Sequence, residues 1–534
     1  MVIEYKRLPR SSDFDSDEFK DKLRTRRRRC PSFFSFPRKA TRVCRPLYIV
    51  VTFIAFLVWQ LTFNASYTNP QPFTIPPNET VYIAANIVDA DLINGAWGQS
   101  LVELVDLIGK DRVYVSIYGG PTSALKTFES QLDCDTSLVS EEEDPVDLKS
   151  IPRTTLSTGE TKIKRIAYLA EVRNKALRPL DTLNRKFDKV LFINDVYFSP
   201  MDAARVLWGT NLNAEGVAEY KAVCGMDFAT SWEYYDTFAT RDLEGYSMGV
   251  PIFPWFANEG DAISRNDVLE GRDAVRVKSC WGGIVAFDAR YLQRDLSSFH
   301  ITATEYPETD EHFKIPRKSD TKALDPPQLP LRFRSEQEPF WDSSECCLIH
   351  ADIIALPPFL VPSNDTSKEY REGIFMNPYV RVSYHASTQK HMWLTQRFER
   401  LFAVPQAIIN GFAKMPRYNY RREEVEGEAV EDRVWVTSTA GEGDDETGHE
   451  FGGEDSTWQG SGVEKSKSKR ATIGKGKGKE YWENEGKYVD FNRKANRGGY
   501  CGVRKLSVLK ESKGEGEGNW DNLLDEVPPL EVGR

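Results

Sequence analysis

Residues 81–120 alternate between strand and helix patterns, and this alternation limits the fold more than any other feature of the chain. The strand patterns are VYIAANIV at 81–88 and RVYVSIYGG at 112–120, and between them WGQSLVELVDLIG at 97–109 carries an apolar stripe at helical spacing. A strand, a helix and a strand at this spacing form a βαβ unit, whose two strands are parallel. The pattern therefore predicts an α/β fold with a mainly parallel central sheet.

A later strand pattern, KVLFINDVYFSP at 189–200, ends abruptly on two polar residues. Its run from Val190 to Ile193 is continuously apolar, as in a strand that is covered on both faces. Ligands bind at the carboxyl ends of the strands in open α/β sheets, and here that end carries Asn194 and Asp195. A sugar-nucleotide enzyme would be expected to place an Asp-x-Asp metal clamp there, but only Asp195 is acidic. The alternative for Asp195 is a helix cap or a turn.

The segment IAYLAEVRNKALRPL at 166–180 predicts a helix with an arginine on its apolar side. At 100° per residue Arg173 falls near the centre of the apolar stripe, and Asn174 falls at its edge. A buried arginine is costly unless it is paired, so Arg173 is either part of a structural ion pair or a group that grips a phosphate or a sugar. Because a parallel strand follows this helix, we expect Arg173 and Asp195 near the same sheet edge, holding a diphosphate and a divalent metal.

Three further segments carry candidate ligands. The stretch 221–256, which contains Asp227, mixes aromatic rings with carboxylates, as a carbohydrate site or an aromatic core would. In VKSCWGGIVAFDA at 277–289, Trp281 precedes two glycines that permit close backbone approach. The helix pattern SECCLIHADIIALP at 344–357 places three more candidates, Glu345, His350 and Asp352, near one another. For His350, burial as a packed histidine is the commoner alternative to metal binding.

The N-terminal part of the chain resembles a signal anchor. Residues 1–46 carry 14 Lys/Arg against 6 Asp/Glu, and residues 47–63 carry no charge. The positive-inside rule then predicts a type II topology, with 1–46 in the cytosol, one transmembrane helix at 47–63 and the rest in the lumen. Glycosylation sequons lie on that predicted lumenal side, at Asn64, Asn78 and Asn364.

Beyond the predicted span, composition suggests four regions. These are a stem at 64–79, a globular domain at 80–415, a disordered Gly-rich and charged segment at 416–490, and a C-terminal segment at 491–534. In the last of these, Cys501 could be tied back to the domain by a disulfide, although the pairing of the cysteines cannot be read from the sequence. The basic stretch at 465–479 does not predict nucleic-acid binding, because acidic residues flank it. Motifs typical of serine hydrolases, zinc proteases, P-loop proteins and dinucleotide-binding folds are absent from the sequence.

Several strings occur together in an order typical of one family. They are AEVRNKALRPL, FDKVLFINDVYFSP, AVCGMDF, SCWGGIVAFDA, LRFRSEQ, SECCLIHADI, NPYVRVSYH and GGYCGVRKL. With these strings the chain resembles the fungal capsule-associated α-1,3-mannosyltransferases. The resemblance implies a GT-A-like nucleotide-diphospho-sugar transferase fold in a Golgi or ER membrane protein. It also implies retaining transfer of mannose from GDP-mannose to a mannose-containing acceptor, in cell-wall or capsule polysaccharide synthesis.

The resemblance also implies roles for individual residues. Arg173, Asn174 and Asn194 would contact the nucleotide sugar, and Asp195 would hold Mn²⁺ (or Mg²⁺). Five further residues complete the predicted site. Asp227 and Trp281 would bind substrate, Glu345 and Asp352 would take part in catalysis together with Asp195, and His350 would be a second metal ligand. The expected partners are GDP-mannose, the glycan acceptor, one membrane span and other Golgi transferases, but no nucleic acid. Two alternatives remain: a non-catalytic assembly or export factor with this fold, and a transferase that uses another nucleotide sugar.

Overall fold

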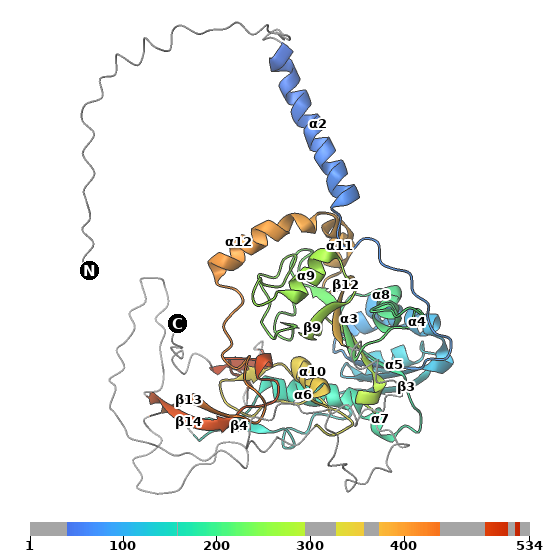
Figure 1. Ribbon diagram of the computed structural model, residues 1–534. Coiled ribbons are helices and arrows are strands. Elements are labelled where there is room, and N and C mark those ends of the chain that lie inside the picture. The colour runs from blue at the N-terminus through green and yellow to red at the C-terminus, as the bar shows by residue number, and fades with distance from the viewer. Residues whose placement is uncertain are drawn as a thin grey trace, which may run out of the picture. The chain divides into compact units, whose positions relative to one another are not determined.

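The computed structural model describes residues 40–156, 159–293, 327–356, 373–437, 486–510 and 518–523 (Figure 1). The chain divides into two compact units, Met1–Thr62 and Phe63–Arg534, and each is described by itself.

The described part of the first unit is helix α2 (Ala40–Phe63). Its uncharged stretch, 47–63, has 17 residues and includes Gln60, whereas a hydrocarbon core needs about 20 apolar residues. Among the residues that the structure describes, no helix combines the length and the apolar character needed to cross a membrane. The predicted transmembrane helix is therefore wrong, and so is the predicted location as a single-pass Golgi or ER membrane protein with a lumenal domain.

The second unit is built on a nine-stranded sheet with the order β3-β2-β1-β6-β10-β7-β12-β9-β8. Its strands are β1 (Val81–Asn86), β2 (Val113–Tyr118), β3 (Asp135–Val139), β6 (Lys189–Ile193), β7 (Ala222–Phe228), β8 (Arg241–Asp242), β9 (Val275–Ser279), β10 (Ile284–Asp288) and β12 (Ile374–Ser383). The predicted βαβ unit is confirmed, because β1 and β2 are parallel, with Val81 opposite Val113, and α4 (Ala96–Ile108) lies between them in the chain.

The sheet is mainly parallel with two reversed strands: seven of its nine strands run in one direction, and β9 and β10 run in the other. Strands β1, β2, β3 and β6 form parallel pairs, as do β7 and β12, but β10 is antiparallel to both β6 and β7, and β9 is antiparallel to β12 and β8. The reversal into β10 follows two glycines with positive φ, Gly282 (+56°) and Gly283 (+71°). A side chain at Gly282 would start 2.0 Å from the carbonyl oxygen of Gly225, so this reversal requires glycine.

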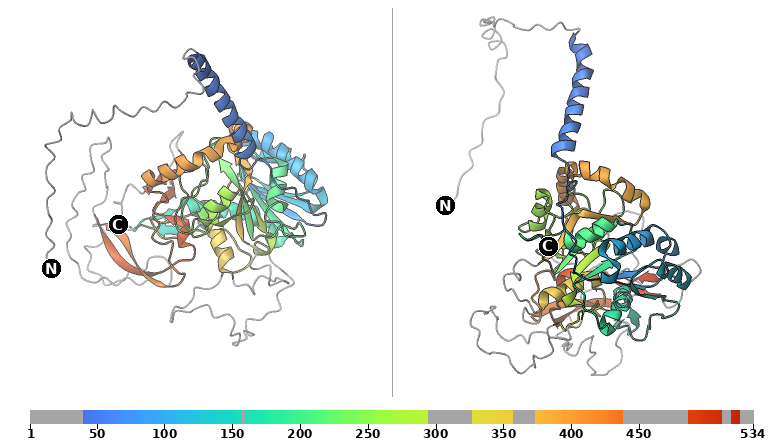
Figure 2. Two further views of the ribbon diagram at one scale, coloured as in Figure 1. Left: turned by 45° about the horizontal axis from the view of Figure 1, so that its top comes forward. Right: turned by 90° about the vertical axis from the view of Figure 1, so that its right-hand side faces the viewer.

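Helices cover both faces of the sheet (Figures 1 and 2). On one face α4, α5 (Thr122–Glu129) and α8 (Pro200–Trp208) share a hydrophobic core with Ile83 and Leu191. On the other, α6 (Arg165–Leu177) and α10 (Glu345–Ala355) pack over Tyr82, Val190 and Phe192. The side chains of successive β6 residues therefore point alternately into the two cores on opposite faces of the sheet, which explains the continuous apolar run of this strand.

Shorter elements complete the second unit. They are α3 (Ala90–Ile93), β4 (Arg153–Thr155), β5 (Thr161–Ile163), α7 (Pro179–Thr182), α9 (Ile263–Glu270), β11 (Asp342–Ser343), α11 (Ala386–Phe398), α12 (Ala403–Ala413), β13 (Ala429–Thr437), β14 (Gly486–Lys494), β15 (Gly502–Val503), β16 (Ser507–Leu509) and β17 (Trp520–Asn522).

The C-terminal part of the chain is tied to the domain. Strand β15 pairs with β11, and a disulfide joins Cys501 to Cys347 on α10. A second disulfide, Cys224–Cys280, links β7 to the turn before β10. Strand β13 pairs antiparallel with β14, so residues 429–437 are ordered within the range 416–490, for which the composition had predicted disorder. The cause is the partner strand β14, which lies some fifty residues later; residues 438–485 lie outside the described part.

The segment 64–79, predicted to be a stem, contacts the folded unit. The Tyr67 side chain is buried, and its hydroxyl donates to the carbonyl oxygen of Val268 at 3.1 Å. The backbone amide of Ser66 donates to the carbonyl oxygen of Gln396 at 2.9 Å. These contacts hold the segment along the domain.

Candidate active site

Several strand ends meet at one edge of the sheet. Strands β6 and β7 both run antiparallel to β10, and β12 runs parallel to β7, so the carboxyl ends of β6, β7 and β12 share an edge with the start of β10. This topology gathers five side chains there: Asn194 and Asp195 after β6, Asp227 in β7, Trp281 before β10, and Tyr384 after β12.

Arg173 of α6 lies at the centre of this group. Its Nε donates to Oε1 of Glu345 at 3.1 Å, and its Nη1 donates to Oδ1 of Asn194 at 3.4 Å. Its guanidinium lies 4.4 Å from the centroid of the Trp281 ring, a cation–π distance. The side chain is 13% exposed, and within the described part of the chain its Nη2 makes no hydrogen bond. One corner of a rigidly held guanidinium is thus free for a ligand.

Asn194 holds the site together. Its Oδ1 accepts from the Trp281 indole at 3.1 Å as well as from Arg173, and its backbone oxygen accepts from the indole of Trp97 at 2.9 Å. Its backbone amide donates to Gly283 at 2.9 Å. Because two donors already occupy its side-chain oxygen, Asn194 positions Arg173 and Trp281 and does not replace the missing acid of a metal clamp.

Asp195 is exposed beside this group, within electrostatic reach of the Asp89 carboxylate. Desolvation raises the pKa of Asp195, the carboxylate of Asp89 raises it further, and Arg173 opposes the shift. Asp89 follows β1, and its side chain accepts from the amides of Asp91 and Leu92 at the start of α3. An Mn²⁺ or Mg²⁺ ion takes one or two carboxylates plus phosphate oxygens. Asp195, with Asp89 nearby, fits that requirement.

Two carboxylates, the buried Asp227 and the half-buried Asp236, form a pair next to the turn that carries Trp281. Oδ1 of Asp227 accepts from the backbone amide of Asp236 at 3.0 Å, and its Oδ2 accepts from the Tyr384 hydroxyl at 3.0 Å. Asp236 in turn accepts from the amides of Ala239 (3.0 Å) and Gly282 (3.3 Å). Desolvation and the charge of Asp236 raise the pKa of Asp227 to about 8, so the pair holds one proton near neutral pH.

The sequence analysis did not select Asp236, Tyr384 or Asp89. Asp236 was one of several acids in the aromatic stretch at 221–256, and nothing in its spacing singled it out. Tyr384 directly follows a strand, as Asn194 does, so its position at a strand end was a usable signal. Asp89 follows the first strand in the same way.

Two of the predicted site residues, Asn174 and Asp352, lie in structural contacts instead. Asn174 exchanges two hydrogen bonds with the backbone of Phe333, both at 2.8 Å. Asp352 binds Arg334 through two hydrogen bonds of 2.8 and 3.0 Å, and lies 3.6 Å from Arg497. Seven residues, about 10 Å of helix, separate Asp352 from Glu345 along α10. The structure therefore brings Glu345 to Arg173 but leaves Asn174 and Asp352 in other contacts.

His350, predicted as a metal ligand, is fully buried away from this edge. Its Nδ1 lies 2.7 Å from the carbonyl oxygen of Cys346, and its ring packs against Phe287, which pairs with Val190 in the interior of the sheet. His350 lies near the sulfurs of Cys224 and Cys280, but these form a disulfide and are not thiolate ligands. Burial lowers the pKa of His350 to about 4, so its ring is neutral.

The predicted glycosylation sites lie outside this group of residues. Asn78 is exposed and Asn64 is half-buried, while Asn364 falls outside the described residues.

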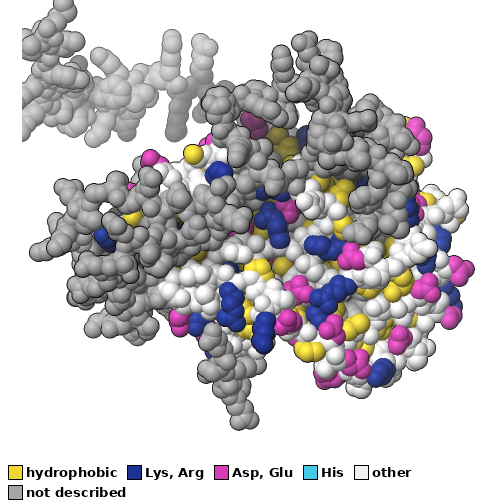
Figure 3. Space-filling model, turned by 90° about the horizontal axis from the view of Figure 1, so that it is seen from below, with side chains coloured by type: hydrophobic (Ala, Val, Ile, Leu, Met, Phe, Trp, Pro, Cys, Tyr) yellow, Lys and Arg dark blue, Asp and Glu magenta, His cyan; other side chains and the backbone are white. Residues whose placement is uncertain are grey.

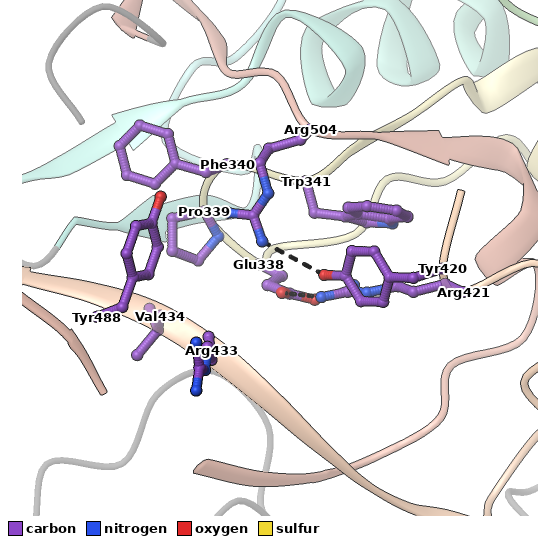
Figure 4. Close-up of a pocket in the computed structure, with 10 residues that line it drawn as sticks. All are labelled: Glu338, Pro339, Phe340, Trp341, Tyr420, Arg421, Arg433, Val434, Tyr488 and Arg504. Carbon is purple, nitrogen blue, oxygen red and sulfur yellow. Dashed lines mark hydrogen bonds and ion pairs between the residues drawn. The ribbon is translucent and has the colours of Figure 1, made fainter. Parts of the chain in front are cut away.

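A shallow pocket lies elsewhere, between the loop 338–341 and the β13–β14 pair (Figure 4). Arg421 lies in it, 4.1 Å from the centroid of the Trp341 ring, with both terminal nitrogens bound to Glu338 and a further contact to Asp432. Arg504 points toward the Tyr420 hydroxyl at 3.5 Å. None of the predicted site residues lines this pocket.

Comparisons with known proteins bear on the class of the chain. One solved structure that resembles it is the mannosyltransferase PcManGT from Pyrobaculum calidifontis in complex with GDP-Man and Mn²⁺, at 12% identity over 68% of this chain and 75% of that one, with a TM-score of 0.29. Another is glucosyl-3-phosphoglycerate synthase from Mycobacterium tuberculosis with Mn²⁺, uridine-diphosphate and phosphoglyceric acid, at 10% identity over 69% and 90%, with a TM-score of 0.27. A search of curated proteins finds no match.

A family model of glycosyltransferases matches residues 80–352, about half of the chain, and this range contains all of the edge residues except Tyr384. The chain is therefore a glycosyltransferase. The family is that of cryptococcal mannosyltransferase 1, and the chain belongs to it.

Proposed function

We propose that this glycosyltransferase moves mannose from GDP-mannose to a mannose-containing glycan, forming an α-1,3 linkage with retention at the anomeric carbon. The observation that carries the proposal is the geometry of Arg173. In a chain of a mannosyltransferase family, a guanidinium fixed by Glu345, Asn194 and Trp281 lies beside an exposed carboxylate at the ligand-binding edge of the sheet.

Arg173 binds the donor diphosphate in this proposal. Its Nε and Nη1 donate to Glu345 and Asn194, so Nη2 is the nitrogen left to donate a hydrogen bond to a phosphate oxygen. Because the guanidinium is held before substrate arrives, it stabilises the charge that develops on the leaving GDP without having to reorganise. A divalent ion held by Asp195 would supply further neutralisation of the diphosphate charge.

Retention follows when the acceptor hydroxyl enters on the face from which GDP leaves. The bond from the acceptor oxygen to the anomeric carbon forms as the bond from that carbon to the phosphate oxygen breaks, and the hydroxyl proton passes to the departing phosphate. This route needs no enzyme nucleophile. Asp227 is buried and both of its carboxylate oxygens already accept hydrogen bonds, so in this proposal it positions Tyr384 at the edge of the site and does not itself receive a sugar hydroxyl.

The test is sugar transfer by the purified full-length chain. Wild type is incubated with a mannobiose acceptor and, in turn, GDP-mannose, GDP-linked and UDP-linked glucose, and UDP-linked xylose, each with and without Mn²⁺. The proposal expects product from GDP-mannose, with an α-1,3 bond by NMR. Asp195→Asn should reduce the Mn²⁺-stimulated rate by at least about 10-fold, whereas Asp106→Asn, a substitution of an exposed carboxylate on α4, should leave it unchanged.

The alternatives give different results in the same experiment. Product from a UDP-sugar but not from GDP-mannose would change the donor and keep the site. Binding of no nucleotide sugar, with no transfer, would favour a non-catalytic assembly factor. Equal rates for wild type and Asp195→Asn at every Mn²⁺ concentration would remove Asp195 from the site.

A further inference from the structure

Helix α12 (Ala403–Ala413, AVPQAIINGFA) is amphipathic, but its polar side faces the protein and its apolar side faces outward. Its buried residues are the polar Gln406 and Asn410. Its apolar side chains face outward: Val404 is 68% exposed and Phe412 is 86% exposed, with Ile408 and Ile409 between them. Val404, Ile408 and Phe412 are spaced four residues apart and so form one stripe along the helix.

Hydrogen bonds hold this orientation in place. Oε1 of Gln406 accepts from Nη1 of Arg265 at 2.6 Å, and its Nε2 donates to the carbonyl oxygens of Val250 (3.2 Å) and Phe256 (3.3 Å). Oδ1 of Asn410 accepts from the backbone amide of Val250 at 2.7 Å. Turning the helix to bury its apolar stripe would break these bonds and leave buried polar groups unpaired. The stripe is therefore held outward by the fold.

Neighbouring segments extend the apolar surface. Trp393 and Leu394 on α11 and Leu401 before α12 are exposed as well. With the stripe of α12 they make seven exposed apolar residues between positions 393 and 412, with an aromatic residue on each helix, Trp393 and Phe412. We call these seven residues, Trp393, Leu394, Leu401, Val404, Ile408, Ile409 and Phe412, the α12 face.

Basic side chains border the α12 face. Residues 386–418 contain five Lys/Arg and one acid, Glu399. Glu399 is buried and binds Arg381 through two hydrogen bonds of 2.7 Å, so it adds no negative charge to the surface. Lys390, Lys414 and Arg417 are exposed. By contrast, the lower face of the molecule shows basic and acidic side chains mixed together (Figure 3).

We propose that the α12 face binds the surface of an anionic lipid bilayer, with Val404, Ile408 and Phe412 in the upper acyl region and Lys414 and Arg417 against the headgroups. An apolar helix face with aromatic residues and a basic border is the composition of interfacial membrane-binding helices. This is attachment to one leaflet and includes no membrane span. It is independent of the donor site.

The basic border distinguishes a bilayer from a second copy of the chain. In a two-fold dimer through this face, each copy would bring the same surface to the interface. Basic side chains of one copy would then approach basic side chains of the other, because residues 386–418 offer no exposed acid to pair with them. Anionic headgroups supply that complementary charge.

The test places a fluorescent probe on the helix itself, because α2 has apolar surface of its own. An environment-sensitive dye is attached at Phe412→Cys in the full-length chain. The same dye at Val88→Cys, another exposed apolar position, is the matched control, and the unsubstituted chain corrects for labelling of native cysteines. The chain is mixed with vesicles of phosphatidylcholine alone or with 30% phosphatidylserine.

The proposal expects a blue shift and a rise in emission of at least about twofold at position 412 with phosphatidylserine vesicles, and no change at position 88. K414Q/R417Q should raise the lipid concentration at half-saturation at least about threefold, and 0.5 M NaCl should do the same. If the protein binds the vesicles but the emission of the dye at position 412 does not change, the proposal is overturned. An equal response on raising protein concentration without lipid would also overturn it, because that result would assign the face to a second copy.

Discussion

Arg421 and Arg173 each lie against a tryptophan ring, and their remaining contacts differ. Arg421 lies 4.1 Å from the Trp341 ring and Arg173 lies 4.4 Å from the Trp281 ring. The terminal nitrogens of Arg421 bind Glu338 and Asp432, and its side chain is 3% exposed. Arg173 binds one carboxylate through Nε and one amide through Nη1, and its side chain is 13% exposed.

The difference separates a structural ion pair from a ligand-binding group. Two carboxylates offset the charge of Arg421, and the protein leaves its terminal nitrogens no room for a ligand. Arg173 is oriented by its partners but keeps a terminal nitrogen unbound at the edge where strands end. Substitution should therefore affect stability at Arg421 and activity at Arg173.

The largest effect is expected from Arg173→Lys. Lysine keeps the charge but carries all its donors on one nitrogen, without the planar fork that reaches Glu345, Asn194 and a phosphate from separate atoms, so transfer should fall by about 100-fold or more. The rate of mannose transfer at saturating acceptor measures this. Arg178→Lys, at the exposed C-terminal cap of the same helix, is the control and should retain the wild-type rate. An equal loss of transfer rate in both variants would mean that the substitutions disturb helix α6 and that Arg173 has no specific role in the site.

Arg421→Met should have the opposite effect, lowering the stability of the protein while leaving its transferase activity intact. The change leaves the half-buried Glu338 and the buried Asp432 with less compensating charge, although Arg493 still binds Asp432. We expect the free energy of unfolding to fall by about 3 kcal/mol. Denaturant unfolding followed by tryptophan fluorescence measures the loss, and transfer per folded molecule should stay within about twofold of wild type. A large loss of transfer in folded protein would erase the distinction between the two arginines.

Asp227→Asn should change how stability depends on pH. The folded-state pKa of Asp227 is about 8, above its unfolded value, so the folded state holds a proton that the unfolded state releases between these values. The wild type should therefore lose about 1.4 kcal/mol of stability per pH unit from this site between pH 5 and 7. Asparagine keeps an acceptor oxygen and does not titrate, so the slope in urea unfolding should flatten. An unchanged slope would mean that the pair holds no proton.

The smallest effect is expected from Asn174→Ala. This change removes two hydrogen bonds to the backbone of Phe333 and should cost about 1–2 kcal/mol of stability. The KM for donor should not change, because the side chain has no remaining group to offer a nucleotide. Thermal unfolding and donor titration are measured on the same preparation. A raised KM with unchanged stability would return Asn174 to the substrate site.

Local pattern in the sequence was enough for the first sheet strands. The βαβ unit and the buried β6 were predictable because each depends on residues close in the chain. The antiparallel insertion of β10 was not, because it depends on the pairing of strands about ninety residues apart along the chain, here Ile193 with Ile284. Strand β13 was missed for the same reason, since its partner follows a long stretch of polar sequence.

The site was predictable where a residue's position in its element showed the direction of its side chain. Arg173 on an apolar stripe and the polar pair after β6 met these conditions. Asn174 and Asp352 did not, because the groups that bind them, Phe333 and Arg334, lie in a segment without regular periodicity. The pairing of Asp227 with Asp236 and Tyr384 likewise depends on loop geometry.

The most direct test of the donor site is GDP binding by the full-length chain, measured by calorimetry with guanosine as the ligand that lacks phosphates. If Arg173 holds the diphosphate, Arg173→Lys should weaken GDP binding at least about 10-fold, while any binding of guanosine stays the same and Arg421→Met binds GDP as wild type does. Equal GDP affinity in wild type and Arg173→Lys would contradict the assignment of this edge as the donor site.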